Sequence, residues 1–100
     1  MKESQFREYC LKRNIGEGKI EQAVKAVREF EEDLGKKGKT FESATVDDVK
    51  KYVSILVSEG RNSTDRLLAL ARYSSFVKKN DLYIYFASIL GGRNVMPTLS

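Results

Sequence analysis

The segment from Asn62 to Lys79, NSTDRLLALARYSSFVKK, has the pattern of a helix that is apolar on most of its sides. Asn62 or Ser63 is expected to cap it, because a short polar side chain there accepts a hydrogen bond from a free backbone N–H of the first turn. Its apolar residues occupy several sides of a helical wheel: Leu67, Leu68, Leu70, Ala71, Phe76 and Val77. A helix that is apolar nearly all round has to lie inside a bundle. This segment therefore predicts a domain in which other helices surround it.

Three earlier segments have apolar residues at spacings of three and four, which is the period of an amphipathic helix. We expect these helices over about Glu3–Arg13, Lys19–Lys36 and Val46–Ser58. Glycines follow each of the three, and glycine commonly ends a helix. Thr45 precedes the third segment, where its hydroxyl can cap the first turn.

The last apolar segment is Leu82–Leu90, LYIYFASIL, in which periodicity does not distinguish a helix from a strand. We favour a helix, started by a cap at Asn80-Asp81, because no partner strand is evident elsewhere in the chain. The sequence thus predicts an all-α fold, a compact bundle of four to five short helices. We expect one domain over residues 1–92 and a tail or linker over residues 93–100.

Positive charge is concentrated in the second half of the chain. Residues 1–48 carry 10 basic and 11 acidic side chains, whereas residues 49–100 carry 8 basic and 3 acidic ones. A net charge of +4 that is distributed this unevenly is typical of a protein that binds a nucleic acid or another polyanion. A net charge of this size also serves solubility alone. Charge by itself favours neither interpretation.

Few residues are suited to catalysis or to a cofactor. The chain has no histidine and one cysteine, Cys10, which falls on the apolar edge of the first helix and is expected to be a buried, inert thiol. Zinc and iron–sulfur sites need more such ligands. We therefore expect neither an enzyme nor a cofactor. A third interpretation is an enzyme that binds Mg²⁺ through an acidic run in the second helix. This run consists of Glu29, Glu31, Glu32 and Asp33.

That acidic run is more often a solvated helix face with basic neighbours. Pairs at i,i+4 are expected to neutralise it: Glu21 with Lys25, Lys25 with Glu29, and Arg28 with Glu32.

The chain has no apolar run long enough to span a membrane and no signal peptide in MKESQFREY, so we expect a cytoplasmic protein without a membrane partner. Tyrosines in the basic half are able to stack on nucleic-acid bases, but packing in the core explains them better: Tyr73, Tyr83 and Tyr85.

Several cations are placed where they can contact phosphates. Arg72 and Lys79 are seven residues apart, which predicts that they share one face of the fourth helix. Arg61 lies in the connector before that helix, and a loop arginine beside a helix N-terminus suits a phosphate. The alternative is that these are scattered surface charges.

The order of these elements resembles the N-terminal core-binding domain of tyrosine recombinases, the phage-integrase type with a SAM-like fold. Three stretches carry the resemblance, which covers about residues 4–80: AVKAVREFEEDLGKKGKTF from Ala23 to Phe41, TVDDVKKY from Thr45 to Tyr52, and STDRLLALARYSSFVKK from Ser63 to Lys79. The chain departs from the family in two ways. The second helix carries as much acid as base, and NDLYIYFASILGGRN stands in place of an Asn-Pro linker.

The resemblance implies a helical domain that clamps duplex DNA opposite a separate catalytic domain of the same parent chain. In that family the second and fourth helices face DNA, which would place Lys19, Lys25 and Arg28 of the second helix, and Arg66 and Arg72 of the fourth, near phosphates. The family's catalytic residues lie in the other domain, so the resemblance implies no cleavage by this chain. The prediction is a non-catalytic DNA-binding domain, and the alternative is a helical domain that docks another domain or dimerises through residues 82–90.

Overall fold

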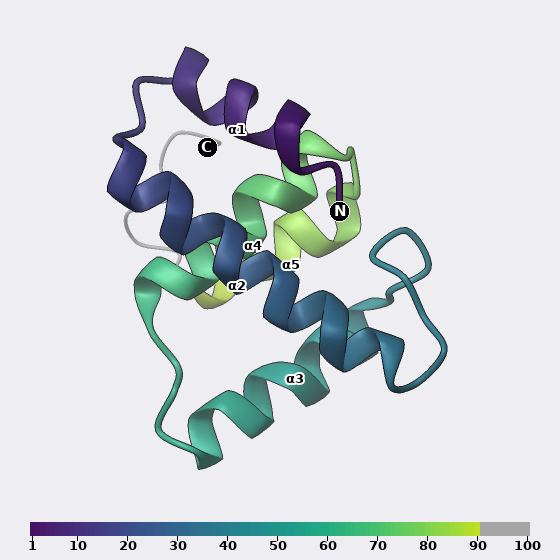
Figure 1. The fold of residues 1–100 in the computed structure, drawn as a ribbon. Helices are drawn as coiled ribbons and strands as arrows, with labels where there is room; N and C mark the ends of the chain where they lie inside the picture. Colours follow the sequence, from purple (N-terminus) through teal and green to yellow (C-terminus); the bar gives the residue numbers. More distant parts are fainter. Residues whose placement is uncertain (91–100) are drawn as a thin grey trace.

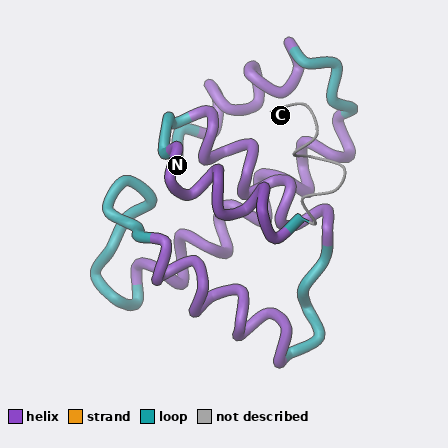
Figure 2. Tube along the Cα trace, turned by 180° about the vertical axis from the view of Figure 1, so that it is seen from behind, coloured by secondary structure: helices purple, strands orange, loops and turns teal. Residues whose placement is uncertain are grey.

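The computed structural model describes residues 1–90, which form five α-helices and no strand (Figures 1 and 2). The helices are α1 (Glu3–Lys12), α2 (Glu17–Gly35), α3 (Val46–Ser58), α4 (Thr64–Phe76) and α5 (Asn80–Ile89). The all-α prediction is confirmed, and so is the helical assignment of the last apolar segment. Residues 91 and 92 and the expected tail at 93–100 lie outside the described residues.

Helix α4 is the centre of the bundle, because it packs most extensively against both α2 and α5. Helix α2 crosses in front of α4 and α5 in Figure 1, with α1 at one end of the molecule and α3 at the other. The same arrangement appears from behind in Figure 2. The apolar residues of α4 are thereby covered from several sides, as the pattern of residues 62–79 predicts.

A chain of aromatic side chains runs through the core and joins four helices and a loop. Phe30 of α2 lies 4.7 Å from Tyr52 of α3 and 5.7 Å from Phe41, between ring centroids. Phe41 lies 4.7 Å from Tyr73 of α4, and Tyr73 lies 5.0 Å from Phe6 of α1. Phe41 belongs to the loop between α2 and α3, yet it is fully buried. Tyr73 is fully buried too, which agrees with the packing role expected for it.

The start of α3 is fixed by reciprocal hydrogen bonds at its first turn. The Thr45 side chain accepts from the backbone N–H of Asp48 at 3.3 Å, and the Asp48 carboxylate accepts from the backbone N–H of Thr45 at 2.9 Å. Lys39 donates to the same carboxylate at 2.8 Å. This capping box explains why α3 has the predicted bounds. Ser63 caps α4 with a single hydrogen bond, by accepting from the N–H of Arg66 at 3.1 Å.

Four helices are followed by a residue in the left-handed conformation. The backbone N–H of the residue after it donates to the carbonyl oxygen five positions earlier in the chain. The left-handed residues are Asn14, Gly38, Gly60 and Lys78, with φ of 62°, 71°, 68° and 63°. The corresponding bonds are Ile15 to Cys10, Lys39 to Leu34, Arg61 to Leu56 and Lys79 to Ser74. This is the Schellman pattern, which satisfies the last carbonyls of a helix.

Three predicted boundaries are corrected. Helix α4 ends at Phe76 and does not reach Lys79, because Lys78 adopts the left-handed conformation. Helix α2 begins at Glu17, two residues before the predicted start. Asn80 is the first residue of α5 and not its cap, and the Lys79 position before it makes no side-chain capping bond.

Candidate nucleic-acid interface

A groove lined by polar and basic side chains lies where α2 packs against the first turns of α4. One hollow of about 310 Å³ is lined by Gln22 and Lys25 of α2 and by Asp65 and Arg66 of α4. A second, smaller hollow shares Gln22 and Asp65 with it, so the two hollows adjoin. We call this surface the α2–α4 groove and define it by Lys19, Gln22, Lys25, Asp65, Arg66 and Arg72.

Helical spacing explains how these side chains share one surface. Lys19, Gln22 and Lys25 recur at three residues along α2, and residues at this spacing are neighbours on a helix. Small residues lie beneath them. Ala23, Ala26 and Ala69 are almost completely buried, which lets α2 and α4 approach closely. Cations from both helices therefore border the same groove.

Three of the groove's four cations form no ion pair with residues 1–90: Lys19, Lys25 and Arg72. The N-terminus of α4, where Ser63 lies, opens into the same groove. The helix dipole adds positive potential there. Asp65 opposes it, because its carboxylate lies in the first turn of α4 among the cations.

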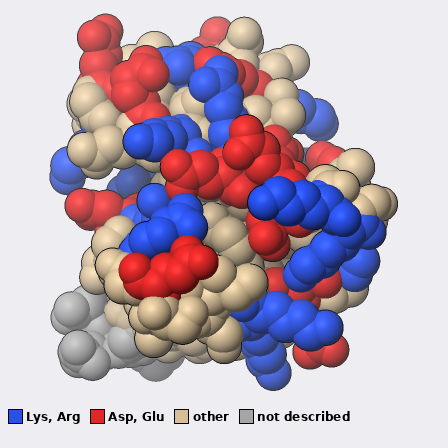
Figure 3. Space-filling view, turned by 60° about the horizontal axis from the view of Figure 1, so that its bottom comes forward, with Lys and Arg blue, Asp and Glu red and all other residues tan. Residues whose placement is uncertain are grey.

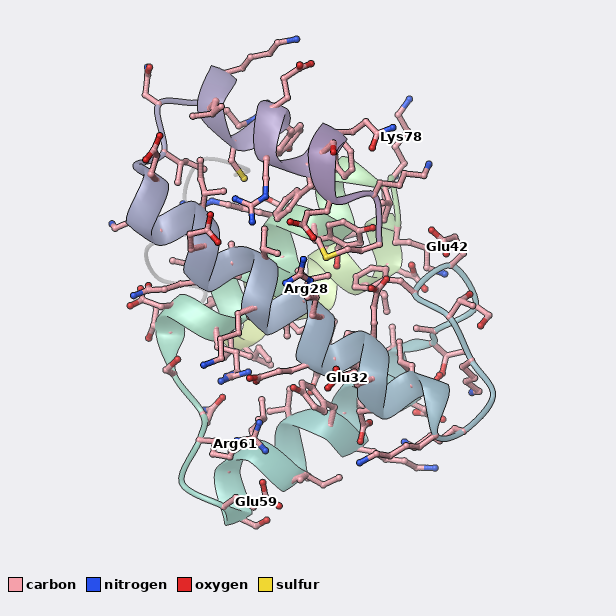
Figure 4. All side chains as sticks on the ribbon, in the orientation of Figure 1. Arg28, Glu32, Glu42, Glu59, Arg61 and Lys78 are labelled. Carbon is pink, nitrogen blue, oxygen red and sulfur yellow. The ribbon has the colours of Figure 1, made fainter. Side chains whose placement is uncertain are left out.

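The fourth cation, Arg66, is bound to a carboxylate of α2. Its guanidinium donates to Glu29, and Arg61 donates to the same carboxylate at 3.3 Å. The hydrogen bond from Arg66 is the main cause that lowers the pKa of Glu29. Arg61 also donates to Glu59 at 2.8 Å. Figure 4 shows Arg61 between α3 and α2, so this predicted phosphate contact lies beside the groove and is already paired.

The remaining two predicted contacts lie elsewhere. Arg28 forms an ion pair with Glu3 of α1 and does not line the groove. Figure 4 shows it directed from α2 toward α1. The Lys79 ammonium donates to the backbone carbonyl of Glu42 at 2.9 Å. Because α4 ends at Phe76, the prediction that Lys79 shares a helix face with Arg72 is wrong.

The predicted i,i+4 pairs on α2 are replaced by pairs between helices. Glu21 binds Arg7 of α1, Arg28 binds Glu3, and Glu29 binds the two arginines of the α3–α4 region. Arginine presents a planar fork of donors, so tertiary neighbours compete well for these carboxylates. Glu21 and Glu29 of α2 are thus bound by arginines of other elements.

Sequence reasoning missed two residues of the groove, Gln22 and Asp65. The spacing of Gln22 from Lys19 and Lys25 is a signal that would have found it. Asp65 has no such signal, because an acidic residue in a first turn is usual in any helix. It reduces the positive potential of the groove by one charge.

The described residues contain no group of three or more His, Cys, Asp or Glu side chains placed to hold a metal ion. Among the described helices, none is both long and apolar enough to cross a membrane. Cys10 is fully buried, and burial raises the pKa of its thiol. A nucleophilic thiolate is therefore disfavoured at neutral pH.

Charges of both signs are interspersed over the face drawn in Figure 3, where acidic side chains lie between basic ones. That face is therefore not a broad basic surface. Comparison of the chain with protein-family models, with curated proteins and with solved structures finds no match.

Proposed function

We propose that this domain binds duplex DNA through the α2–α4 groove, as a non-catalytic arm that works with a catalytic domain of the same parent chain. One observation carries the proposal: Lys25 and Arg66 line one hollow between α2 and α4, and Lys19 and Arg72 line the hollow that adjoins it. Duplex DNA offers regularly spaced phosphates, and cations from two helices suit such a path. The resemblance of residues 4–80 to the core-binding domain of integrases supports the same helices as the DNA-facing ones.

Binding of this kind is driven by phosphate contacts. The groove offers lysines, arginines and a helix N-terminus, and phosphate contacts position a protein without reading base sequence. We therefore expect weak sequence preference and strong dependence on salt. Neutralising three or four phosphates gives a slope of about −3 to −4 for log affinity against log salt.

An NMR titration with a short duplex of mixed sequence tests the proposal. At low salt, backbone amide shifts should concentrate at the groove face of α2 and the first turns of α4, and they should weaken steeply as salt rises. Helix α1 and the exposed side of α3 serve as internal controls. Shifts spread evenly over the surface, or an absence of shifts at low salt, would contradict the proposal.

The alternative function is docking or dimerisation through residues 82–90. This idea depends on apolar side chains that the bundle leaves exposed. Helix α5 buries Leu82, Phe86 and Ala87, and Ile84 is the large apolar side chain of α5 that stays mostly exposed, at 60%. A single exposed isoleucine is common on monomeric proteins, so we favour the DNA-binding function. A dimer at micromolar concentration, broken by Ile84→Glu, would favour docking instead.

A further inference from the structure

A second polar cavity lies on the other side of Arg61, between the C-terminal half of α2 and helix α3. It has a volume of about 360 Å³. We call it the α2–α3 cleft and define it by Glu29, Glu32, Asp33, Tyr52, Ile55 and Glu59. Lys36 and Arg61 also line it. None of these residues lines the α2–α4 groove.

Two buried polar atoms in this cleft lack a hydrogen-bond partner. Within residues 1–90, the buried side-chain nitrogen and oxygen atoms without a partner are Asp33 Oδ2 and the Tyr52 hydroxyl oxygen. Tyr52 is 4% exposed. The nearest cation to Asp33 Oδ2 is Lys37 Nζ at 3.9 Å, which is too long for a hydrogen bond. Buried polar atoms are normally satisfied, so their coincidence in one cleft indicates a missing partner.

The charges of the cleft define what that partner is. Glu29 and Glu59 are both engaged by Arg61. Glu32 forms no ion pair with any of residues 1–90, and Figure 4 shows it in the region between α2 and α3. Glu32 is thus without an ion pair among residues 1–90. Asp33 Oδ2 and the Tyr52 hydroxyl oxygen accept no hydrogen bond of normal geometry, although Lys37 Nζ lies 3.9 Å from Asp33 Oδ2 and Arg66 lies near the Tyr52 hydroxyl. All three groups can accept hydrogen bonds.

Four carboxylates and two cations, Lys36 and Arg61, line the cleft, so its net charge is negative. This charge and the three acceptors favour a cation that donates several hydrogen bonds. A guanidinium or a primary ammonium has such donors, whereas an anion would be repelled. Ile55 lines the same cleft and is 40% exposed, so it offers an apolar wall. The aliphatic stem of a lysine or arginine packs readily on such a wall while its charged end reaches acceptors.

We propose that the α2–α3 cleft binds a guanidinium or primary ammonium group carried on an aliphatic stem, held by Glu32, Asp33 and Tyr52. A Lys or Arg side chain of a partner protein and a free polyamine share this chemistry. The site does not require DNA binding by the α2–α4 groove, so either proposal can fail without the other.

A titration of the ¹⁵N-labelled protein with four probes tests the site: N-acetyl-arginine amide, agmatine, spermidine and tetramethylammonium. The first three donate N–H bonds, and the last is a cation without donors. We expect saturable shifts at Glu32, Asp33 and Tyr52 with the donors, and at least tenfold weaker binding of tetramethylammonium. Tighter binding of N-acetyl-arginine amide identifies a protein side chain as the source, and tighter binding of spermidine identifies a polyamine.

Two variants make the test specific. Tyr52→Phe removes one acceptor and keeps the ring in the core, and Glu32→Gln removes one charge; each should weaken binding at least threefold. Asp47→Asn changes the same charge at an exposed position of α3 outside the cleft and should leave affinity unchanged. Equal binding of tetramethylammonium, equal losses in all three variants, or no saturable shifts with any probe would overturn the proposal.

Discussion

Arg66 of α4 and Glu29 of α2 form an ion pair that ties together the two helices of the α2–α4 groove. The Glu29 side chain is 27% exposed and that of Arg66 is 20% exposed, so the pair lies near the surface, between the α2–α4 groove and the α2–α3 cleft, and not in the core. A second arginine, Arg61, binds the same carboxylate. One acidic side chain therefore holds two of the seven cations that the sequence suggested as phosphate contacts.

Releasing these arginines should strengthen DNA binding. Glu29→Gln removes the carboxylate that competes with phosphate for Arg61 and Arg66. We expect about threefold to tenfold tighter binding to a short duplex at moderate salt, which corresponds to roughly 0.6 to 1.4 kcal/mol. Fluorescence anisotropy with labelled DNA measures it. Glu8→Gln on α1 changes the net charge equally at a position with 72% exposure. An equal gain in DNA affinity in both variants would mean that the change in net charge alone accounts for the tighter binding.

Asp48 should make the stability of the domain depend on acid pH. The ammonium of Lys39 and the backbone N–H of Thr45 hold the pKa of Asp48 at about 2, below its usual 3.8. The stabilisation is therefore complete above about pH 4 and is lost as pH falls toward about 2. Asp48→Asn should lower the free energy of unfolding at pH 7 by about 1 to 2 kcal/mol and flatten this acid dependence.

Urea unfolding followed by circular dichroism at several pH values checks the role of Asp48. Asp47→Asn is the matched control, because Asp47 lies in the same first turn of α3 and is exposed. The free energy of unfolding of the Asp47→Asn variant should stay within about 0.5 kcal/mol of that of the unaltered protein. Parallel pH profiles for the Asp48→Asn variant and the unaltered protein would show that the capping box contributes no linkage.

Phe41 should contribute to stability as much as a core residue of a helix does, although it lies in a loop. Its ring is fully buried against Phe30 and Tyr73. Phe41→Ala should cost about 3 to 5 kcal/mol, the usual range for a buried aromatic residue. Chemical denaturation measures it, with Glu42→Ala at the next, exposed position as the control. A loss below about 1 kcal/mol would contradict the packing described for this loop.

Cys10 should react with thiol reagents only when the domain opens. The residue is fully buried, and burial raises the pKa of its thiol. In a Ser58→Cys variant, which adds an exposed thiol at the end of α3, we expect one fast and one slow equivalent with a disulfide reagent near pH 8. Denaturant should make both fast. Two fast equivalents in the folded protein would contradict burial of Cys10.

Local signals explain why some helix boundaries are predictable. Helix α3 matches its predicted range because Thr45 caps its start and Gly60 supplies the left-handed residue after its end. Helix α4 does not match, because its left-handed residue is Lys78. A lysine rarely adopts this conformation, so nothing in the sequence marks the stop.

The candidate site was predictable only in part, because spacing fixes a helix face and not its neighbours. Lys19, Lys25 and Arg72 lie on the groove as the DNA-facing helices of the resemblance imply, but that they contact DNA stays a prediction. The pairing of Arg28 with Glu3 joins residues that are 25 positions apart. Such contacts depend on how the helices pack, which periodicity does not reveal.

The salt dependence of DNA affinity in a groove variant tests the central claim most directly. Lys19→Glu with Arg72→Glu reverses two groove cations, and Lys12→Glu with Lys51→Glu makes the same net charge change on α1 and α3. We expect the unaltered domain to bind a short duplex with a slope of about −3 to −4 in log affinity against log salt. The groove variant should lose at least about tenfold in affinity, or roughly 1.4 kcal/mol, and much of that slope. Equal losses in the two variants, or no binding by the unaltered domain at low salt, would contradict DNA binding through the α2–α4 groove.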